Sequence, residues 1–198
     1  MEGKRRYELK ERAVKQAATR QRIVDAALAL HREVGPARTT ISEVARRAGV
    51  GRVTVYNHFP DETALLGACS AQFVAESPPP DPGAWAGTKD PDDRLKEALA
   101  ELYGYYRDNE AMLANVGRDA AIVPALADVL EASGAREHEA AMRDVLMAGR
   151  KLRGKRERRT RAAISLALAF ATWQRLTAED GLRDGEAAKL MSRAVSAA

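Results

Sequence analysis

Two glycines separate two short helical patterns in the stretch TTISEVARRAGVGRVTVYNHF, residues 39–59. Thr40 and Glu43 have the spacing of a capping box that begins the first helix. Gly49 lies where a left-handed residue would end that helix, and Gly51 precedes the second one. Two helices joined by a tight, glycine-containing turn match the helix-turn-helix unit, whose second helix lies in the major groove of DNA. The stretch therefore predicts a DNA-binding unit.

Helical spacing continues on both sides of this stretch. From about Arg20 the apolar residues recur three or four positions apart, and Gly35-Pro36 stops the pattern. Asp61 is in position to cap a further helix. Residues 77–91, SPPPDPGAWAGTKDP, contain four prolines before the Asp90-Pro91 helix start. This segment is the clearest boundary in the chain.

Beyond the boundary the spacing predicts more helices and neither strand alternation nor repeats. The expected ranges are about 91–106, 111–116, 124–148 with an interruption near Ser133-Gly134, 162–176, and a last helix from Asp184. The prediction is an all-α fold, with an N-terminal three-helix helix-turn-helix domain and a C-terminal helical domain for ligand binding and dimerisation. We assign residues 1–19 to a basic flexible arm, 20–66 to the DNA-binding domain and 67–198 to the effector-binding and dimerisation domain.

The net charge of +4 conceals an asymmetry. Residues 1–60 hold 13 lysines and arginines against 6 acidic residues, and the remainder holds 19 against 22. A basic first third suits a nucleic-acid-facing end, or a charged face that keeps the protein soluble. The same two interpretations apply to the arm, which can also extend the next helix backward; its basic residues are Lys4, Arg5, Arg6, Lys10, Arg12 and Lys15. The basic stretch 150–161 is interpreted as a solvated helix start.

Other classes of protein are disfavoured. No apolar run reaches the roughly 18 residues of a membrane span, and the N-terminus lacks the apolar core of a signal peptide. We therefore expect a cytoplasmic protein with no membrane partner. Cys69 is alone, which excludes an internal disulfide and argues against zinc. His31, His58 and His138 lie far apart and no catalytic motif is present, so we expect no enzyme, no catalytic residue, no metal and no cofactor.

The second helix carries side chains suited to DNA. Arg52 can pair bidentately with guanine, and Asn57 with adenine. Tyr56 and His58 can donate to phosphates, although a structural capping role for His58 stays open. Free N–H groups at the two helix starts can also bind phosphate oxygens. The expected DNA contacts are Thr39, Thr40, Gly51, Arg52, Val53, Thr54, Tyr56, Asn57 and His58.

The segment TTISEVARRAGVGRVTVYNHFPDETALL resembles the DNA-binding segment of the TetR family of transcriptional regulators. The likeness covers about residues 20–66. Val55 and Phe59 are expected to anchor the second helix from behind. Glu62 stands where family members usually place a lysine that contacts a phosphate, and Gly51 stands where serine is common. The residues in register are Thr40, Ile41, Ala45, Gly49, Val50, Tyr56, Phe59 and Leu65.

The resemblance implies a sequence-specific regulator, expected to be a repressor, that binds a palindromic double-stranded DNA operator as a homodimer. The two C-terminal helices are the expected pairing surface, with Ala163, Ala167, Phe170, Ala171, Trp173, Leu190, Met191, Ala194 and Val195. The resemblance also implies release from DNA by a small effector, which an apolar lining would make lipophilic or flat and aromatic. The expected lining residues are Tyr103, Tyr106, Met112, Val116, Met142, Leu146, Phe170 and Trp173. The alternative is an architectural or non-specific DNA-binding protein without an effector.

Overall fold

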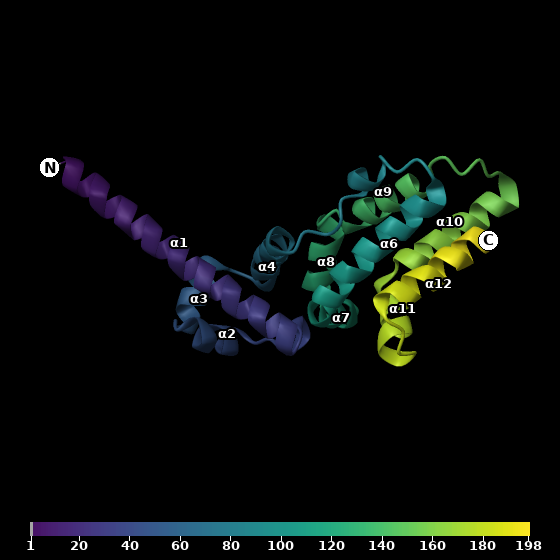
Figure 1. The fold of residues 1–198 in the computed structure, drawn as a ribbon. Helices are drawn as coiled ribbons and strands as arrows, with labels where there is room; N and C mark the ends of the chain where they lie inside the picture. The colour runs from purple at the N-terminus through teal and green to yellow at the C-terminus, as the bar shows by residue number, and fades with distance from the viewer. Residues whose placement is uncertain (1) are drawn as a thin grey trace. The chain divides into compact units, whose positions relative to one another are not determined.

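The computed structural model describes residues 2–198, and for residues 2–6, 8 and 9 it describes the backbone alone. Every regular element among these residues is helical, so the all-α prediction is confirmed (Figure 1). None of the described helices combines the length and the apolar character of a membrane span.

The chain packs into two units. The first comprises the residues up to Ser77 together with Ala114–Ser133, and the second comprises Pro78–Leu113 and Gly134–Ala198. The first contains α1 (Glu2–Glu33), the 3-10 turn η1 (Pro36–Arg38), α2 (Ile41–Ala48), α3 (Arg52–His58), α4 (Glu62–Glu76) and α8 (Pro124–Ala132). The second contains α5 (Pro82–Trp85), α6 (Pro91–Asp108), α9 (Ala135–Met147), α10 (Gly154–Leu168), α11 (Phe170–Gln174), the π-helical turn η2 (Arg175–Glu179) and α12 (Asp184–Ala197). Helix α7 (Glu110–Asp119) begins in the second unit and ends in the first.

Residues 2–19 are the first half of α1 and run directly into the helix predicted from Arg20 (Figure 1). The segment is therefore a backward extension of that helix, which is one of the two possibilities that the sequence left open for the arm. Its Glu, Lys, Arg, Gln and Ala residues have high helix propensity, and Lys15 pairs with Glu11 one turn earlier at 2.9 Å. Lys10 and Arg12 are exposed, whereas the side chains of Lys4, Arg5 and Arg6 lie outside the described residues.

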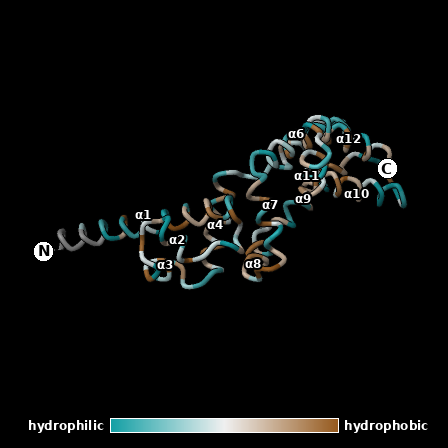
Figure 2. The backbone as a smooth tube through the Cα atoms, turned by 90° about the horizontal axis from the view of Figure 1, so that it is seen from below, coloured by the Kyte–Doolittle hydropathy of each residue, from teal (hydrophilic) through white to brown (hydrophobic). Residues whose placement is uncertain are grey.

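The first unit is held together by one apolar side of α1 and by α4 packed on α8. Ile23, Ala27 and Leu30 of α1 are buried, as their spacing predicted. Leu66 of α4 packs with Val123 and Leu126, and Figure 2 shows α8 as a largely hydrophobic segment. Because of this packing, the compact unit contains more of the chain than the domain predicted at 20–66: it includes all of α4 and residues 114–133.

In the second unit α6 supplies the largest share of the core. Its buried face is the one that the spacing predicted, with Leu95, Ala98, Leu99, Leu102, Tyr103 and Tyr106. Helix α12 runs antiparallel to α6, since Arg107 near the end of α6 binds Asp184 at the start of α12 at 2.7 Å. Pro91 at the other end of α6 lines a cavity with Ser196 near the end of α12.

The continuous helix predicted over 162–176 is wrong at Ala169. This residue is extended, with φ −72° and ψ 129°, and separates α10 from α11. A break leaves the last carbonyl groups of a helix without intrahelical partners. Tyr103 donates its hydroxyl to the Ala167 carbonyl at 2.9 Å, and Tyr106 donates to the Leu168 carbonyl at 2.5 Å. Two side chains of α6 thus stabilise the break.

Candidate nucleic-acid interface

The turn between α2 and α3 has the predicted geometry. The Thr40 hydroxyl accepts a hydrogen bond from the Glu43 backbone N–H at 3.2 Å. Gly49 is left-handed, with φ 66° and ψ 40°, a conformation that glycine adopts without strain. The reciprocal half of the capping box is absent, because the Glu43 carboxylate instead binds the Arg46 guanidinium at 2.9 Å. This hydrogen bond keeps the pKa of Glu43 below its usual value.

Helix α3 has a buried side and an exposed side. Val55 and Phe59 are almost fully buried against the rest of the unit, as expected. On the opposite side Val53 is 72% exposed and Tyr56 is 47% exposed. Arg52 and Asn57 are exposed as well. Four of the predicted DNA contacts therefore share one accessible edge.

Thr54 and His58 lie on a different side of α3, which faces the first half of α1. Both are half-buried. They line a groove of about 460 Å³ whose other wall comes from α1, through Glu11, Arg12, Lys15, Gln16 and Thr19. The α1 extension and α3 therefore form one surface, and no pattern in the sequence indicated that the two helices line a common groove.

The remaining predicted contacts lie at the helix starts. Thr39 is half-buried, and its hydroxyl donates to the Gly35 carbonyl at 2.9 Å, so this side chain holds the turn after α1. Thr40 and Gly51 are exposed. At Gly51 a Cβ would lie 3.9 Å from the Thr54 hydroxyl, an ordinary contact, so the protein fold leaves room for a side chain there.

Two cationic side chains brace α2 and α3 against α1. Arg47 donates to both carboxylate oxygens of Glu33, at 2.6 and 2.8 Å, and this holds the pKa of Glu33 below its usual value. Arg20 stacks on the Phe59 ring, with 4.7 Å between the guanidinium carbon and the ring centre. Bidentate pairs and cation–π contacts of this kind fix orientation as well as adding attraction. Arg47 thus holds α2 on α1, and Arg20 holds the end of α3 on α1.

Three residues of α7 that the sequence analysis missed hold the turn between α1 and α2. Asn115 donates to the His31 carbonyl at 2.9 Å, and Arg118 donates to the Val34 carbonyl at 3.2 Å. The buried Asp119 accepts from the Ala37 N–H at 3.0 Å. Gly35 has φ 92°, and a Cβ there would collide with Arg118 and Asp119. No short-range pattern links residues about 80 positions apart, so the sequence carried no signal for this contact.

Glu62, the position of the departure from the TetR pattern, is exposed at the first turn of α4. It follows the cap Asp61, whose side chain accepts from the Ala64 N–H at 2.8 Å. Both acids line a cavity of about 240 Å³ that also includes Tyr56 and the buried His31. A carboxylate at this place repels phosphate rather than binding it.

The residues predicted to line an effector site do not all come together. Six of them lie in the core of the second unit: Tyr103, Tyr106, Met142, Leu146, Phe170 and Trp173. The Tyr106 ring is the centre of this group, 5.3 Å from Phe170 and 5.9 Å from Trp173. Val116 instead packs beside Leu66 in the first unit, while Met112 is buried.

The polar atoms of the aromatic group bind within the protein. Besides the two tyrosine hydroxyls, the Trp173 indole donates to Asp184 at 2.9 Å. Burial raises the pKa of Tyr103 and of Tyr106, because the apolar surroundings disfavour the phenolate. The aromatic group is therefore a packed core in which the polar atoms of Tyr103, Tyr106 and Trp173 already have hydrogen-bond partners.

The family model for bacterial regulatory proteins of the tetR family matches residues 23–69, from α1 through the helix-turn-helix to α4. This segment of the chain therefore matches the DNA-binding segment of the tetR family of bacterial regulators. The matched segment contains the exposed edge of α3 and its buried anchors.

Similar proteins agree in the same segment. The transcriptional regulator BetI of Serratia proteamaculans is 43% identical over 60 residues, 30% of this chain and 30% of that protein. An uncharacterised helix-turn-helix regulator of Mycobacterium tuberculosis is 38% identical over 60 residues, 30% of this chain and 32% of that protein. The likeness to these TetR-family relatives thus spans about a third of their length. A solved TetR-like regulator from a Rhodococcus species has the same fold over 90% of this chain and 93% of that one, with a TM-score of 0.64 at 18% identity.

Proposed function

We propose that this protein is a sequence-specific transcriptional repressor of the TetR family whose α3 helices read a palindromic operator. The observation that carries the proposal is the two-sided α3. Its exposed edge presents Arg52, Val53, Tyr56 and Asn57, while Val55 and Phe59 fix the helix from behind. Arginine and asparagine read guanine and adenine through paired hydrogen bonds, and an apolar side chain contacts the thymine methyl group. An edge of this composition specifies bases as well as holding phosphates.

The exposed basic face of α1 supports a second part of the interface. Lys10 and Arg12 have no ion-pair partner among the described residues, and Arg12 lines the groove that α1 shares with α3. Phosphate contacts position a protein on the duplex. The logarithm of the binding constant falls linearly with the logarithm of the salt concentration, and each neutralised phosphate adds about 0.9 to the steepness of this slope. Replacing Lys10 and Arg12 together with glutamine should lower the salt slope by about two. An unchanged slope would show that Lys10 and Arg12 do not contact phosphates, and that the charged α1 extension serves solubility instead.

Two exposed leucines support dimerisation through the C-terminal helices. Leu166 on α10 is 58% exposed and Leu190 on α12 is 47% exposed. Of the predicted interface residues, Ala167, Trp173, Met191 and Val195 are buried in the core of their own protomer, so the outward positions, Ala171, Leu190 and Ala194, carry the proposal. Glutamate at Leu166 and Leu190 should yield monomers in sedimentation, whereas glutamate at Ile122, which is more exposed than either leucine and lies in the first unit, should not.

The effector part of the proposal is a lipophilic or flat aromatic molecule held by the helical second unit. The apolar and aromatic composition of that unit supports this class. Binding of the effector releases the operator when it favours one of two conformations, and coupling of this kind is usually worth about 1–3 kcal/mol.

Selection of bound DNA from a random pool tests the central proposal. We expect an inverted repeat with half-sites about one helical turn, ~34 Å, apart, and a preference of at least ~10³ over random DNA. A single unrepeated site contradicts the dimer. Binding without any consensus contradicts sequence reading and favours an architectural DNA-binding protein.

A further inference from the structure

A groove of about 810 Å³ lies between α6 and α12 in the second unit. Its size is within the range of sites that bury a small molecule, about 300–1,000 Å³. The α6 wall consists of Asp92, Lys96 and Ala100, which lie on successive turns of the helix. The rest of the lining comes from α12 and consists mostly of small side chains: Gly185, Ala188, Ser192, Ser196 and Ala197.

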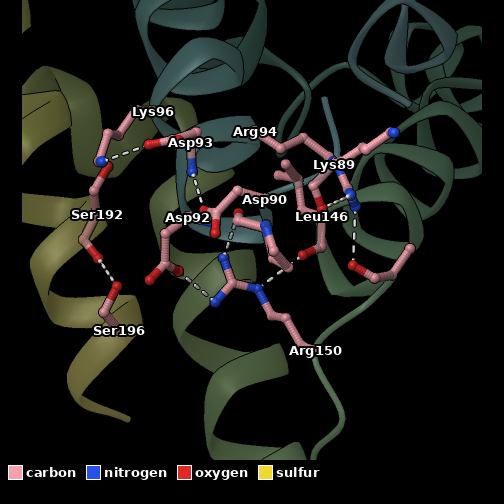
Figure 3. Close-up of polar contacts among 12 residues, drawn as sticks. Lys89, Asp90, Asp92, Asp93, Arg94, Lys96, Leu146, Arg150, Ser192 and Ser196 are labelled. Atoms are coloured by element: carbon pink, nitrogen blue, oxygen red, sulfur yellow. Dashed lines mark hydrogen bonds and ion pairs between the residues drawn. The ribbon is translucent and has the colours of Figure 1, made fainter. Parts of the chain in front are cut away.

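Ser192 is one of the lining residues of this groove, and its hydroxyl has no hydrogen-bond partner. Ser192 is 6% exposed, and its Oγ is the sole buried side-chain oxygen or nitrogen without a hydrogen bond in the part of the chain that the structure describes. Ser196, one turn later, donates to the Ser192 carbonyl at 3.1 Å, the usual bond of a helical serine. Figure 3 shows both serines on α12, with Lys96 from α6 beside them. Buried hydroxyls without partners are costly and rare, so Ser192 points to a missing hydrogen-bonding group.

The charges of the lining favour an anion. Lys96 binds Asp93 at 2.8 Å and Asp92 binds Arg150 at 2.8 Å, so these pairs are internally balanced (Figure 3). Lys189 and Arg193 also line the groove, one turn apart on α12. Both are exposed, and neither has an acidic partner among the side chains that the structure describes. Charge-assisted hydrogen bonds from such cations to carboxylates are stronger than neutral ones.

We propose that the α6–α12 groove binds an organic carboxylate with an extended apolar body. The carboxylate oxygens accept hydrogen bonds from Ser192 and from the two unpaired cations, Lys189 and Arg193. The apolar body lies along the small side chains that line the groove, among them Ala100 of α6 and Ala188 of α12. This site is separate from the aromatic group around Tyr106, whose polar atoms are already bonded within the protein. The inference does not depend on operator recognition, because the binding is measured without DNA.

Calorimetric titration of the full chain with octanoate tests the ligand class. Acetate carries the same charge without the apolar body, and octanol carries the apolar body without the charge. We expect one octanoate per chain, bound at least about tenfold more tightly than either comparison molecule, since a hydrogen bond to a charged group contributes about that factor. Equal affinity for acetate would show that the groove recognises only the negative charge. Equal affinity for octanol would show that it recognises only the apolar body. Either result overturns the proposal, as does a groove covered by a second copy that excludes octanoate.

Substitutions locate the bound octanoate. Lys189→Gln with Arg193→Gln should weaken binding about tenfold or more, and Ala100→Leu, at an exposed position, should obstruct the groove. Lys155→Gln with Arg158→Gln removes two exposed cations from α10 and should leave the affinity unchanged. Octanoate affinity that survives the Lys189 and Arg193 changes in a folded variant overturns the assignment.

Ser192→Ala separates a binding role from a structural one. Removing an unpartnered buried hydroxyl should leave the melting temperature of the ligand-free protein unchanged or raise it. The affinity for octanoate should nevertheless fall several-fold. Unchanged affinity in this variant shows that the hydroxyl has no ligand and contradicts the proposal.

Discussion

The guanidinium of Arg20 on α1 lies 4.7 Å from the centre of the Phe59 ring, which ends α3. A cation–π contact at an exposed site contributes about 0.5–1 kcal/mol. We expect Arg20→Gln to lower the free energy of unfolding by that amount, measured by urea denaturation, and Arg20→Lys to lose less because it keeps the cation. Arg22→Gln removes a cation two residues away that is not stacked on the ring, and should be close to neutral. Equal losses for Arg20 and Arg22 contradict the role of the ring contact.

Arg52 is the residue that we expect to specify a base. It is the first residue of α3 and is exposed on the edge that faces solvent. Arg52→Ala should therefore lose about 1–3 kcal/mol of discrimination at one position of each half-site. Binding to a set of operators with single base changes measures this loss. If the variant binds every operator of the set more weakly by the same factor, Arg52 contacts a phosphate and does not read a base.

Tyr56 is expected to act on the DNA backbone instead. Its ring is 47% exposed on the same edge of α3. Tyr56→Phe removes one hydroxyl donor and should weaken all operators alike by about 1 kcal/mol, with the preferred sequence retained. Repeating the random-pool selection with this variant is the check, and a changed consensus assigns Tyr56 to base reading.

Glu62 offers a gain of function. It is exposed at the first turn of α4, where the family resemblance expects a lysine on a phosphate. Glu62→Lys should strengthen operator binding and steepen its salt slope by about one, because one more phosphate is neutralised. Asp128→Lys makes the same charge change at an exposed position on α8 and serves as the control. A similar gain in both variants reduces the effect to net charge.

The helix-turn-helix could be predicted from the sequence because its signals are local. The Thr40 cap, the left-handed Gly49 and the buried Val55 depend on neighbours within a few residues, and each lies where the pattern indicated. The outcome for Ala169 differs because no glycine or proline marks the break. Its stability comes from Tyr103 and Tyr106, more than 60 residues away. Long-range hydrogen bonds of this kind leave no periodic trace in the sequence.

The candidate sites divide in the same way. Helical spacing located the exposed edge of α3, but it did not distinguish a core residue from a ligand contact in the second unit. Phe170 and Trp173 fit either role by their spacing and are found packed on Tyr106. The α6–α12 groove was not foreseen, because its defining feature is a serine without a partner. Only the positions of surrounding atoms reveal that Ser192 lacks one.

His31 makes the first unit sensitive to acid. It is buried at the end of α1, and burial lowers its pKa from 6.5 to about 4, while the nearby Asp119 opposes the shift. Asp61 and Glu62 line the same cavity from α4 and its cap. Between pH 6.5 and about 4 the unfolded chain binds a proton on this imidazole and the native protein does not. Stability attributable to His31 is therefore lost as the pH falls through this window, at about 1.4 kcal/mol per pH unit and about 3 kcal/mol in all.

Urea denaturation from pH 7 to pH 4 checks this effect. The protein should lose stability more steeply than His31→Gln, whose neutral side chain does not titrate, and the two curves should diverge below pH 6.5. The carboxylates that titrate towards the acid end of this range are present in both proteins, so their own contributions cancel in the difference. Parallel curves would mean that the imidazole takes up its proton in the native state as readily as in the unfolded chain.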